Sequence, residues 1–410
     1  MIDTKKENIS SSSLLSSSAP PGFDAEGLTP PPVKNGVYRT TSLALDLAGH
    51  CNLACRYCAE SATQPRRDLM SPGTLETAWK FLLPDGVPAK GMSIRLGSGE
   101  PLIGFSLMKK LVELQQKVKE PIPVFLTTNG TLIDDEIAEW LIASGWNVKI
   151  SLDGPASVQD KWRVLPGGIG TYERVAKAVT LMAQQIPERF SVTAVLCRGT
   201  DPAEVFDGIA GLGVRRIELV PVAHKSESVS PGPEDVRRYK TFVMNYALRY
   251  LESDEKQLPP ELTRFKQRVL RLMGYTLARI SCGAGRQFLG VGPGGDLYPC
   301  FRFIGVDNYR LGHIETGIDR EAVTAFQEGA GRPYEQRTPC GTCWAAPLCG
   351  GPCFACAEMF GPGDGQPISL HCQYVLADSE AAVTLVNRLR EHNPERLLTF
   401  LPNLGDILGE

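Results

Sequence analysis

The chain has 410 residues, of which 42% are hydrophobic and 22% are charged, so it can bury a large core and is not a disordered polymer. Its 43 lysines and arginines nearly balance 46 aspartates and glutamates, which leaves a net charge of -3 and no electrostatic reason to bind nucleic acid or an acidic membrane. No apolar run approaches the roughly 20 residues of a bilayer span, and the N-terminus lacks the continuous apolar stretch of a secretion signal. We therefore expect a cytoplasmic protein without a nucleic-acid or membrane partner.

The first part of the chain predicts a tail followed by an α/β domain. Residues 1–36 are rich in Ser and Pro, and we expect them to be disordered. In residues 37–232, strand-like runs alternate with helical patterns at a spacing of about 25 to 30 residues, which favours a parallel sheet, doubly wound or curled into a partial barrel. Both designs place chemistry at the carboxyl ends of strands. The expected strands lie within 40–49, 91–99, 123–130, 147–154, 190–199 and 217–223, and expected helices include 106–119, 134–144, 171–185 and 201–212.

The rest of the chain predicts a second, smaller unit. Residues 233–281 are polar and helical in pattern and are expected to form a linker. Residues 282–373 hold eight of the twelve cysteines among many glycines and prolines, which indicates loops tied by metal rather than by a large apolar core. Residues 374–410 begin with a further helical pattern over 375–390.

Three cysteines follow the first expected strand with the spacing C-x3-C-x2-C, and we call Cys51, Cys55 and Cys58 the triplet. Three thiolates from one loop can each bind an iron of a 4Fe-4S cluster and leave the fourth iron open to a small molecule. Zinc is the alternative, but a structural zinc site needs four ligands, and the nearby fourth candidate, His50, is adjacent to Cys51. Isolated Cys197 is expected to be a small buried hydrophobe.

With Tyr57 before its last cysteine, this triplet resembles that of the radical S-adenosylmethionine (SAM) superfamily. The resemblance implies a partial (β/α)6 TIM-like barrel in which the triplet is the catalytic cluster site. Gly99, Glu100 and Pro101 match the family segment that binds the SAM methionine amine, although Ser98 departs from its usual first glycine. Further residues match family positions for SAM: Asn129, Ser151, Asp153 and, for the SAM carboxylate, Arg163.

Each of these short motifs also has an ordinary structural interpretation. Gly99 and Pro101 could simply end a strand, Ser151 and Asp153 could cap a turn, and Arg163 could be a solvated charge. Their order at the expected strand ends favours one shared SAM site.

The C-terminal cysteines resemble the SPASM module, an extension found in many radical SAM enzymes that modify peptides and proteins. The spacing is C-x12-G-x4-C followed by C-x2-C-x5-C-x3-C and a last cysteine. The resemblance implies two auxiliary 4Fe-4S clusters, so three in all. One would be held by Cys282, Cys300 and Cys353, with Cys356 an open candidate as fourth ligand, and the other by Cys340, Cys343, Cys349 and Cys372. A pair of zinc ribbons is the alternative for this segment, and His371 is not expected to be a ligand.

The resemblance implies an oxidoreductase that cleaves SAM reductively to a 5′-deoxyadenosyl radical and abstracts a hydrogen atom from a ribosomal peptide or protein. Phe301 stands where anaerobic sulfatase-maturing enzymes carry an aspartate base, so we expect a maturase that forms thioether or carbon-carbon cross-links, with formylglycine formation as the alternative. A zinc-binding interaction scaffold is the alternative of another class. Expected partners are an electron donor such as flavodoxin or ferredoxin and, because little chain precedes the first strand, a separate leader-binding protein.

Overall fold

The computed structural model describes residues 40–58, 68–254, 257–275 and 281–401. The predictions for the tail 1–36 and for the last residues of the chain lie outside these ranges. One eleven-stranded sheet, in the order β11-β10-β9-β8-β1-β2-β3-β4-β5-β6-β7, runs through the molecule. Its strands are β1 (Ser42–Leu45), β2 (Ser93–Leu96), β3 (Val124–Thr128), β4 (Asn147–Ser151), β5 (Phe190–Leu196), β6 (Arg216–Pro221), β7 (Glu261–Leu262), β8 (Phe288–Val291), β9 (Asp296–Tyr298), β10 (Gly312–His313) and β11 (Gly317–Ile318).

The strands from β8 through β1 to β7 are parallel to their neighbours, and β8 to β11 form an antiparallel meander. All six strands expected between residues 40 and 223 are present. Strand β8 lies beyond Cys282, yet it pairs with β1, so the cysteine-rich segment extends the same sheet. The sequence could not show this pairing, because it joins strands more than 240 residues apart.

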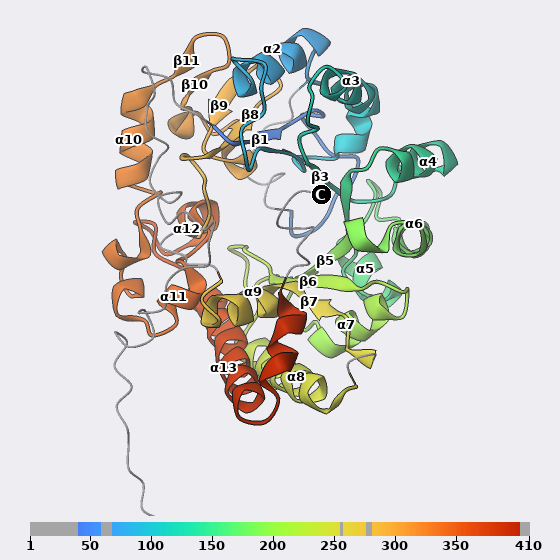
Figure 1. Cartoon of the computed structure of the whole chain (residues 1–410), viewed down its shortest axis with the longest axis vertical. Helices are drawn as coiled ribbons and strands as arrows, with labels where there is room; N and C mark the ends of the chain where they lie inside the picture. The colour runs from blue at the N-terminus through green and yellow to red at the C-terminus, as the bar shows by residue number, and fades with distance from the viewer. Residues whose placement is uncertain (1–39, 59–67, 255–256, 276–280, 402–410) are drawn as a thin grey trace, which may run out of the picture.

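Helices connect the strands and cover one face of the sheet (Figure 1). They are α2 (Pro72–Leu82), α3 (Phe105–Gln115), α4 (Asp135–Ala143), α5 (Ala156–Trp162), α6 (Tyr172–Gln185), α7 (Pro202–Ala210), α8 (Pro233–Glu252), α9 (Thr263–Leu272), α10 (Arg320–Glu328), α11 (Ala346–Cys349), α12 (Phe354–Phe360) and α13 (Ser369–His392). Short 3-10 turns include η2 (Pro101–Gly104), η5 (Phe301–Phe303), η8 (Cys340–Thr342) and η9 (Pro394–Phe400). None of the described helices combines the length and apolar character that a membrane crossing requires.

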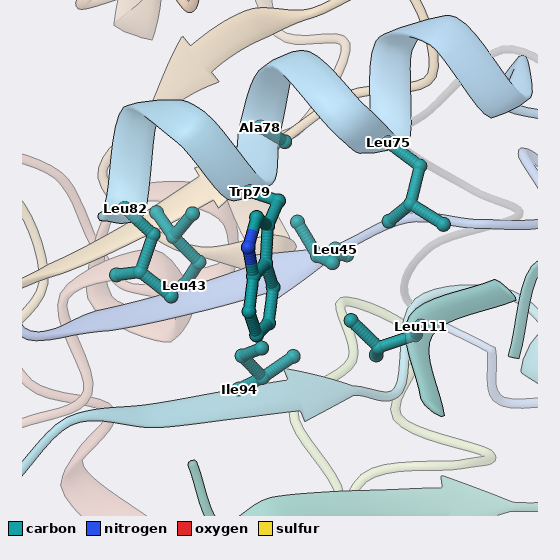
Figure 2. A pocket seen from close by; sticks show the side chains of 8 residues that line it. All are labelled: Leu43, Leu45, Leu75, Ala78, Trp79, Leu82, Ile94 and Leu111. Carbon is teal, nitrogen blue, oxygen red and sulfur yellow. The ribbon is translucent and has the colours of Figure 1, made fainter. Parts of the chain in front are cut away.

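Packing between strands and helices follows in part from alternation along the strands, which is clearest in β5 and β6. Alternate residues of β5 are buried from Phe190 to Leu196, and those between them are partly exposed on the opposite face. Figure 2 shows the same pattern near the N-terminus, where Trp79 and Leu82 of α2 point onto Leu43 of β1 and Ile94 of β2. The other residues around this small apolar pocket are Leu45, Leu75, Ala78 and Leu111. The helix-covered face therefore belongs to the core, and on β5 and β6 the residues of the opposite face are partly exposed.

The helices predicted at 106–119, 134–144, 171–185 and 201–212 correspond to α3, α4, α6 and α7. The expected helix 375–390 begins earlier, because α13 starts at Ser369 and carries Cys372 in its first turn. Helices α8 and α9, within the segment expected to be a linker, pack against α13, and α9 also packs on β6. Figure 1 shows α13 beside α8 and places α11 and α12 along one side of the molecule.

Candidate functional site

The triplet lies in the loop after β1, which is hydrogen-bonded to the end of α5 and to the segment that follows it. The Ala54 amide donates to the Val164 carbonyl at 2.8 Å, and the Arg56 amide donates to the Trp162 carbonyl at 2.9 Å. A loop would otherwise leave these backbone groups to water. The two bonds fix the path of the triplet and bring Arg163 beside it.

Gly99 and Glu100, which follow β2, contact the start of the triplet loop at His50. The Glu100 amide donates to the His50 carbonyl at 2.9 Å, immediately before the first cysteine. Gly99 has a φ of +57°, and a Cβ at this position would stand 2.3 Å from the His50 carbonyl oxygen. Only glycine fits both the left-handed backbone and this close approach.

The Glu100 carboxylate, at 0% exposure, points toward the end of β3. It accepts hydrogen bonds from Thr128 Oγ1 at 2.6 Å and from the Asn129 amide at 2.7 Å, while the Leu102 amide donates to it at 3.1 Å as η2 begins at Pro101. Burial raises the pKa of Glu100, and these three hydrogen bonds oppose that rise. Glu100 therefore joins the carboxyl ends of β2 and β3 into one rigid edge.

Asn129 links this edge to the triplet. Its Nδ2 donates to Asn52 Oδ1 at 2.8 Å and lies 3.6 Å from Cys51 Sγ, and Asn52 Nδ2 in turn donates to Thr131 Oγ1 at 2.9 Å. Sequence reasoning selected Asn129 but missed Asn52 and Thr131, because their partners come from a separate strand end.

Asp153, Tyr57 and Arg163 form a buried group on the other side of the triplet. Tyr57 donates its hydroxyl proton to Asp153 Oδ2 at 2.5 Å, and Arg163 Nε lies 3.1 Å from Asp153 Oδ1. The Arg163 guanidinium also stands 5.4 Å from the centre of the Tyr57 ring. Burial opposes the charge of Arg163, but Asp153 and Tyr57 raise its pKa above the ordinary value. Ser151 is buried at the end of β4, two residues before Asp153.

The surroundings of the triplet fit an iron-sulfur cluster and a polar ligand. Burial raises the pKa of Cys51 to about 12 and that of Cys55 to about 11, so the thiols stay protonated until a metal draws off their protons. Within the described ranges, His50 Nδ1 and Ser98 Oγ are buried polar atoms without a hydrogen-bond partner. Such atoms suit a ligand that brings its own polar groups.

Four of the C-terminal cysteines come together from η8, α11 and α13. Burial raises the pKa of Cys372 to about 12, and the thiolates of Cys349, Cys340 and Cys343 raise it further, because like charges repel at short range. We call these four residues the second set. These four thiols are thus close enough to affect one another electrostatically, and their assignment to one auxiliary cluster stays a prediction.

The remaining four cysteines of the segment form the first set, Cys282, Cys300, Cys353 and Cys356. Burial raises the pKa of Cys300, and the thiolates of Cys353 and Cys282 raise it further. The Cys356 thiol hydrogen-bonds to Cys353 and lowers the pKa of that neighbour. Cys356, left open from the sequence, therefore lies with the first set.

All twelve cysteines are free thiols. Among the described residues, no three His, Cys, Asp or Glu side chains converge closely enough to hold a single metal ion. In a 4Fe-4S cluster each thiolate binds a different iron, so its ligands do not converge on one atom. The two sets and the triplet fit such clusters in donor chemistry.

The structure also shows the surroundings of Cys197 and of His371, the residue before Cys372. Cys197 is 1% exposed at the end of β5, as expected of a small buried hydrophobe. His371 Nε2 lies 2.8 Å from the Val222 carbonyl oxygen, which ties the start of α13 to the end of β6.

Sequence reasoning missed a group of basic residues near the two sets. Arg302 in η5 lowers the pKa of Cys353, after the larger effect of the Cys356 hydrogen bond and against burial, so it lies beside the first set. Arg264, Arg268 and Arg271 recur on α9 at helical spacing and lie near Cys349. The spacing of three and four residues between basic side chains was the available signal, but a solvated helix face shows the same pattern.

Comparison with known proteins shows what this part of the chain is similar to. Residues 46–219 match the model of the radical SAM superfamily. The serine-type anaerobic sulfatase-maturating enzyme of Klebsiella aerogenes is 26% identical over 321 residues, which are 74% of this chain and 76% of that protein. The cysteine-type enzyme of Clostridium perfringens is 26% identical over 347 residues, or 75% of this chain and 87% of that protein.

Two solved structures share the fold. Native anSMEcpe with bound AdoMet and Cp18Cys peptide superposes with a TM-score of 0.72 at 22% identity, covering 85% of this chain and 99% of that chain. Streptococcus suis SuiB bound to precursor peptide SuiA gives a TM-score of 0.55 at 16% identity, covering 82% of this chain and 76% of that chain. These matches confirm the predicted α/β fold with a C-terminal cysteine-containing region.

Proposed function

We propose, with the membership of residues 46–219 in the radical SAM superfamily as the premise, that the protein oxidises a side chain of a peptide or protein substrate. The observation that carries this proposal is the position of the triplet, whose loop is hydrogen-bonded to the segment of Gly99 and Glu100. In this position the side chain of Asn129 lies beside the thiol of Cys51. Relatives that share about three quarters of the chain are maturating enzymes, which supports a protein or peptide as substrate.

The triplet would hold a 4Fe-4S cluster, and the polar edge around it would hold SAM. When bound, this pair supplies one-electron reduction and the abstraction of a hydrogen atom from the substrate. The chain itself orients the ligands. Asn129 contacts Cys51, while Asp153 keeps Tyr57 and Arg163 in place beside the triplet. Fixed polar groups of this kind position reactants and exclude water.

The relatives support oxidation of a serine or cysteine side chain, as in sulfatase maturation, better than they support cross-link formation, the first expectation from the sequence. The substrate carbon gives up one hydrogen as an atom and its heteroatom gives up one as a proton. One further electron then leaves the substrate and needs an acceptor. Serine gives an aldehyde directly, whereas cysteine gives a thioaldehyde that takes up water and releases hydrogen sulfide to form the same aldehyde. The two sets of C-terminal cysteines, as auxiliary clusters, are the proposed acceptors, and a flavodoxin or ferredoxin is the proposed donor for the triplet's cluster.

Cross-link formation is the second candidate, because residue 301 carries no base. Phe301 opens η5 directly after Cys300, and the Arg302 guanidinium stands 5.5 Å from the centre of its ring. A phenyl ring cannot accept the substrate proton, so a serine or cysteine oxidation would need another base. A separate leader-binding protein belongs to this second candidate alone.

The test uses the enzyme purified without oxygen, loaded with iron and sulfide, and supplied with SAM and dithionite. We expect release of 5′-deoxyadenosine and, on synthetic peptides with one serine or one cysteine, conversion to an aldehyde that a hydrazide reagent captures. A peptide that loses two hydrogens without forming an aldehyde, and whose fragments stay joined, would favour the cross-link. Absence of 5′-deoxyadenosine from iron-loaded enzyme would contradict both.

A matched pair of variants makes the test specific. Cys58→Ala removes a triplet ligand, whereas Cys197→Ala removes a buried thiol at the end of β5. We expect the first variant to lose 5′-deoxyadenosine formation and the second to retain it.

A further inference from the structure

Helix α9 presents three arginines to the turn that carries Cys349. Arg264, Arg268 and Arg271 are spaced by four and three residues, so they lie along one side of the helix. Helix α9 packs against α11, which ends at Cys349, and against α13, which carries Cys372. The same helix therefore touches two of the elements that hold the second set.

Two of these arginines bind the backbone at the end of α11. Arg268 Nη1 donates to the Leu348 carbonyl at 2.7 Å, and Arg271 Nη1 donates to the Cys349 carbonyl at 2.9 Å. Carbonyls at a helix C-terminus lack partners within the helix and carry its negative end, so guanidinium groups stabilise them. Gly350 follows with a φ of +79° and ends the turn.

These side chains make long-range hydrogen bonds to the turn, which is also held by burial of Ala345 and Ala346. Within residues 340–350, the backbone hydrogen bonds outside the helices join residues at most four positions apart. Arg268 and Arg271 instead reach across about 80 residues. The position of Cys349 relative to the rest of the protein therefore depends on α9.

The three guanidinium groups also place positive charge near the Cys349 sulfur. Burial, and after it the charge of Arg268, lowers the pKa of Arg271 to about 10, while a thiolate at Cys349 would raise that pKa. A guanidinium group stays protonated in proteins, so Arg268 and Arg271 bring positive charge to the carbonyls that they contact at Leu348 and Cys349. The facing negative groups are Asp378 of α13, which is fully buried and accepts a hydrogen bond from the Tyr239 hydroxyl at 2.7 Å, and Glu218 of β6, which interacts with Arg264. Two carboxylates do not balance the three cations, and Glu218 is also paired with Lys149 at 2.7 Å.

We propose that Arg268 and Arg271 position the Cys349 turn and, through their charge and N–H groups, raise the reduction potential of the 4Fe-4S cluster held by the second set. This inference rests on the proposed function, because it takes that set to be a cluster site. Reduction adds one negative charge to a cluster, and nearby cations and hydrogen-bond donors stabilise the reduced state. The effect is strengthened where water is excluded. A raised potential suits a cluster that accepts the electron left on the oxidised substrate.

The experiment is a redox titration of the iron-loaded full chain, followed by electron paramagnetic resonance, with dithionite as reductant. The component that disappears in Cys372→Ala is assigned to the second set. Arg271→Gln keeps a hydrogen-bond donor but removes the charge, and we expect this component to shift to lower potential. Arg271→Lys keeps the charge and should titrate close to the unmodified protein.

Lys266→Gln is the matched control, because it removes one positive charge from the same helix. Lys266 forms an ion pair with Glu261 of β7 at 2.7 Å, and its loss should move no component. If Arg271→Gln binds full iron and its potentials are unchanged, the proposal is wrong. It is also wrong if Arg271→Gln and Arg271→Lys lose the cluster equally, since charge would then play no part.

Failure of the proposed function gives a different result. If Cys372→Ala removes neither iron nor a resonance component from the otherwise unmodified chain, the second set holds no cluster. That outcome overturns the assignment of the cluster before any arginine is changed.

Discussion

The triplet and the second set hold their cysteines in opposite ways. The triplet lies on a loop whose backbone binds distant segments, from His50 to Glu100 and from Ala54 to Val164. Residues 340–350 fold on themselves in short turns, and side chains of α9 attach them to the rest of the molecule. The comparison teaches that the sheet builds the first site by itself, and we infer that the cluster proposed for the second set would supply much of the order of residues 340–350.

The variant with the largest expected effect, Cys58→Ala, tests whether the sheet holds the triplet site without metal. Cys58→Ala should abolish 5′-deoxyadenosine formation while the melting temperature stays close to that of the unmodified protein, because the sheet edge remains intact. Chromatography of the reaction and a thermal melt provide the two measurements. A large drop in melting temperature would show that the triplet site also needs its metal to fold.

Iron removal tests whether residues 340–349 depend on bound metal for their order. Chelation should accelerate amide hydrogen exchange in residues 340–349 far more than in residues 46–58, because few long-range bonds hold the former. Hydrogen exchange with mass spectrometry, with and without a chelator, compares the two segments in one sample. Equal acceleration in both would remove the distinction.

The buried ion pair beside the triplet predicts an intermediate effect. Asp153→Asn leaves the Arg163 charge without a counter-ion at sites that are 0% and 10% exposed, and should destabilise the fold by about 3 to 5 kcal/mol. Urea denaturation measures the loss. The control Glu188→Gln breaks an exposed pair with Arg215 and should cost about 1 kcal/mol or less. Similar losses in both variants would mean that the Asp153 group is not a rigid support.

The smallest effect concerns the open face of the sheet. Burial opposes ionisation of Glu218 on β6, but Lys149 Nζ at 2.7 Å, with Arg264 and Arg302, lowers its pKa below 4.5. A depressed folded pKa gives stability that is present above the unfolded pKa and is lost as pH falls through the folded value. The stability difference between the unmodified protein and Glu218→Gln should therefore be constant near neutral pH and shrink below pH 4.5. A difference that does not change with acid would contradict the pairing.

Much of the site followed from local patterns. The spacing of the triplet, the Gly99-Glu100-Pro101 segment and the alternation in β5 are each readable within a few residues, since thiolate donors, a left-handed turn and a two-faced strand leave short signatures. The grouping of the second set comes from a resemblance to a cysteine module and stays a prediction. By contrast, neither Asn52 with Thr131 nor Arg268 with Leu348 has a signature, because each contact joins segments that only the folded chain brings together.

The sequence by itself determined which residues could bind metal and which strands and helices would carry them, because donor chemistry and hydrophobic periodicity are local properties. Only the tertiary structure decided that β8 joins the sheet beside β1, that Cys356 lies with Cys353 and Cys300, and that α9 holds the Cys349 turn. Those arrangements depend on packing free energies summed over the whole fold, which no short stretch of sequence contains.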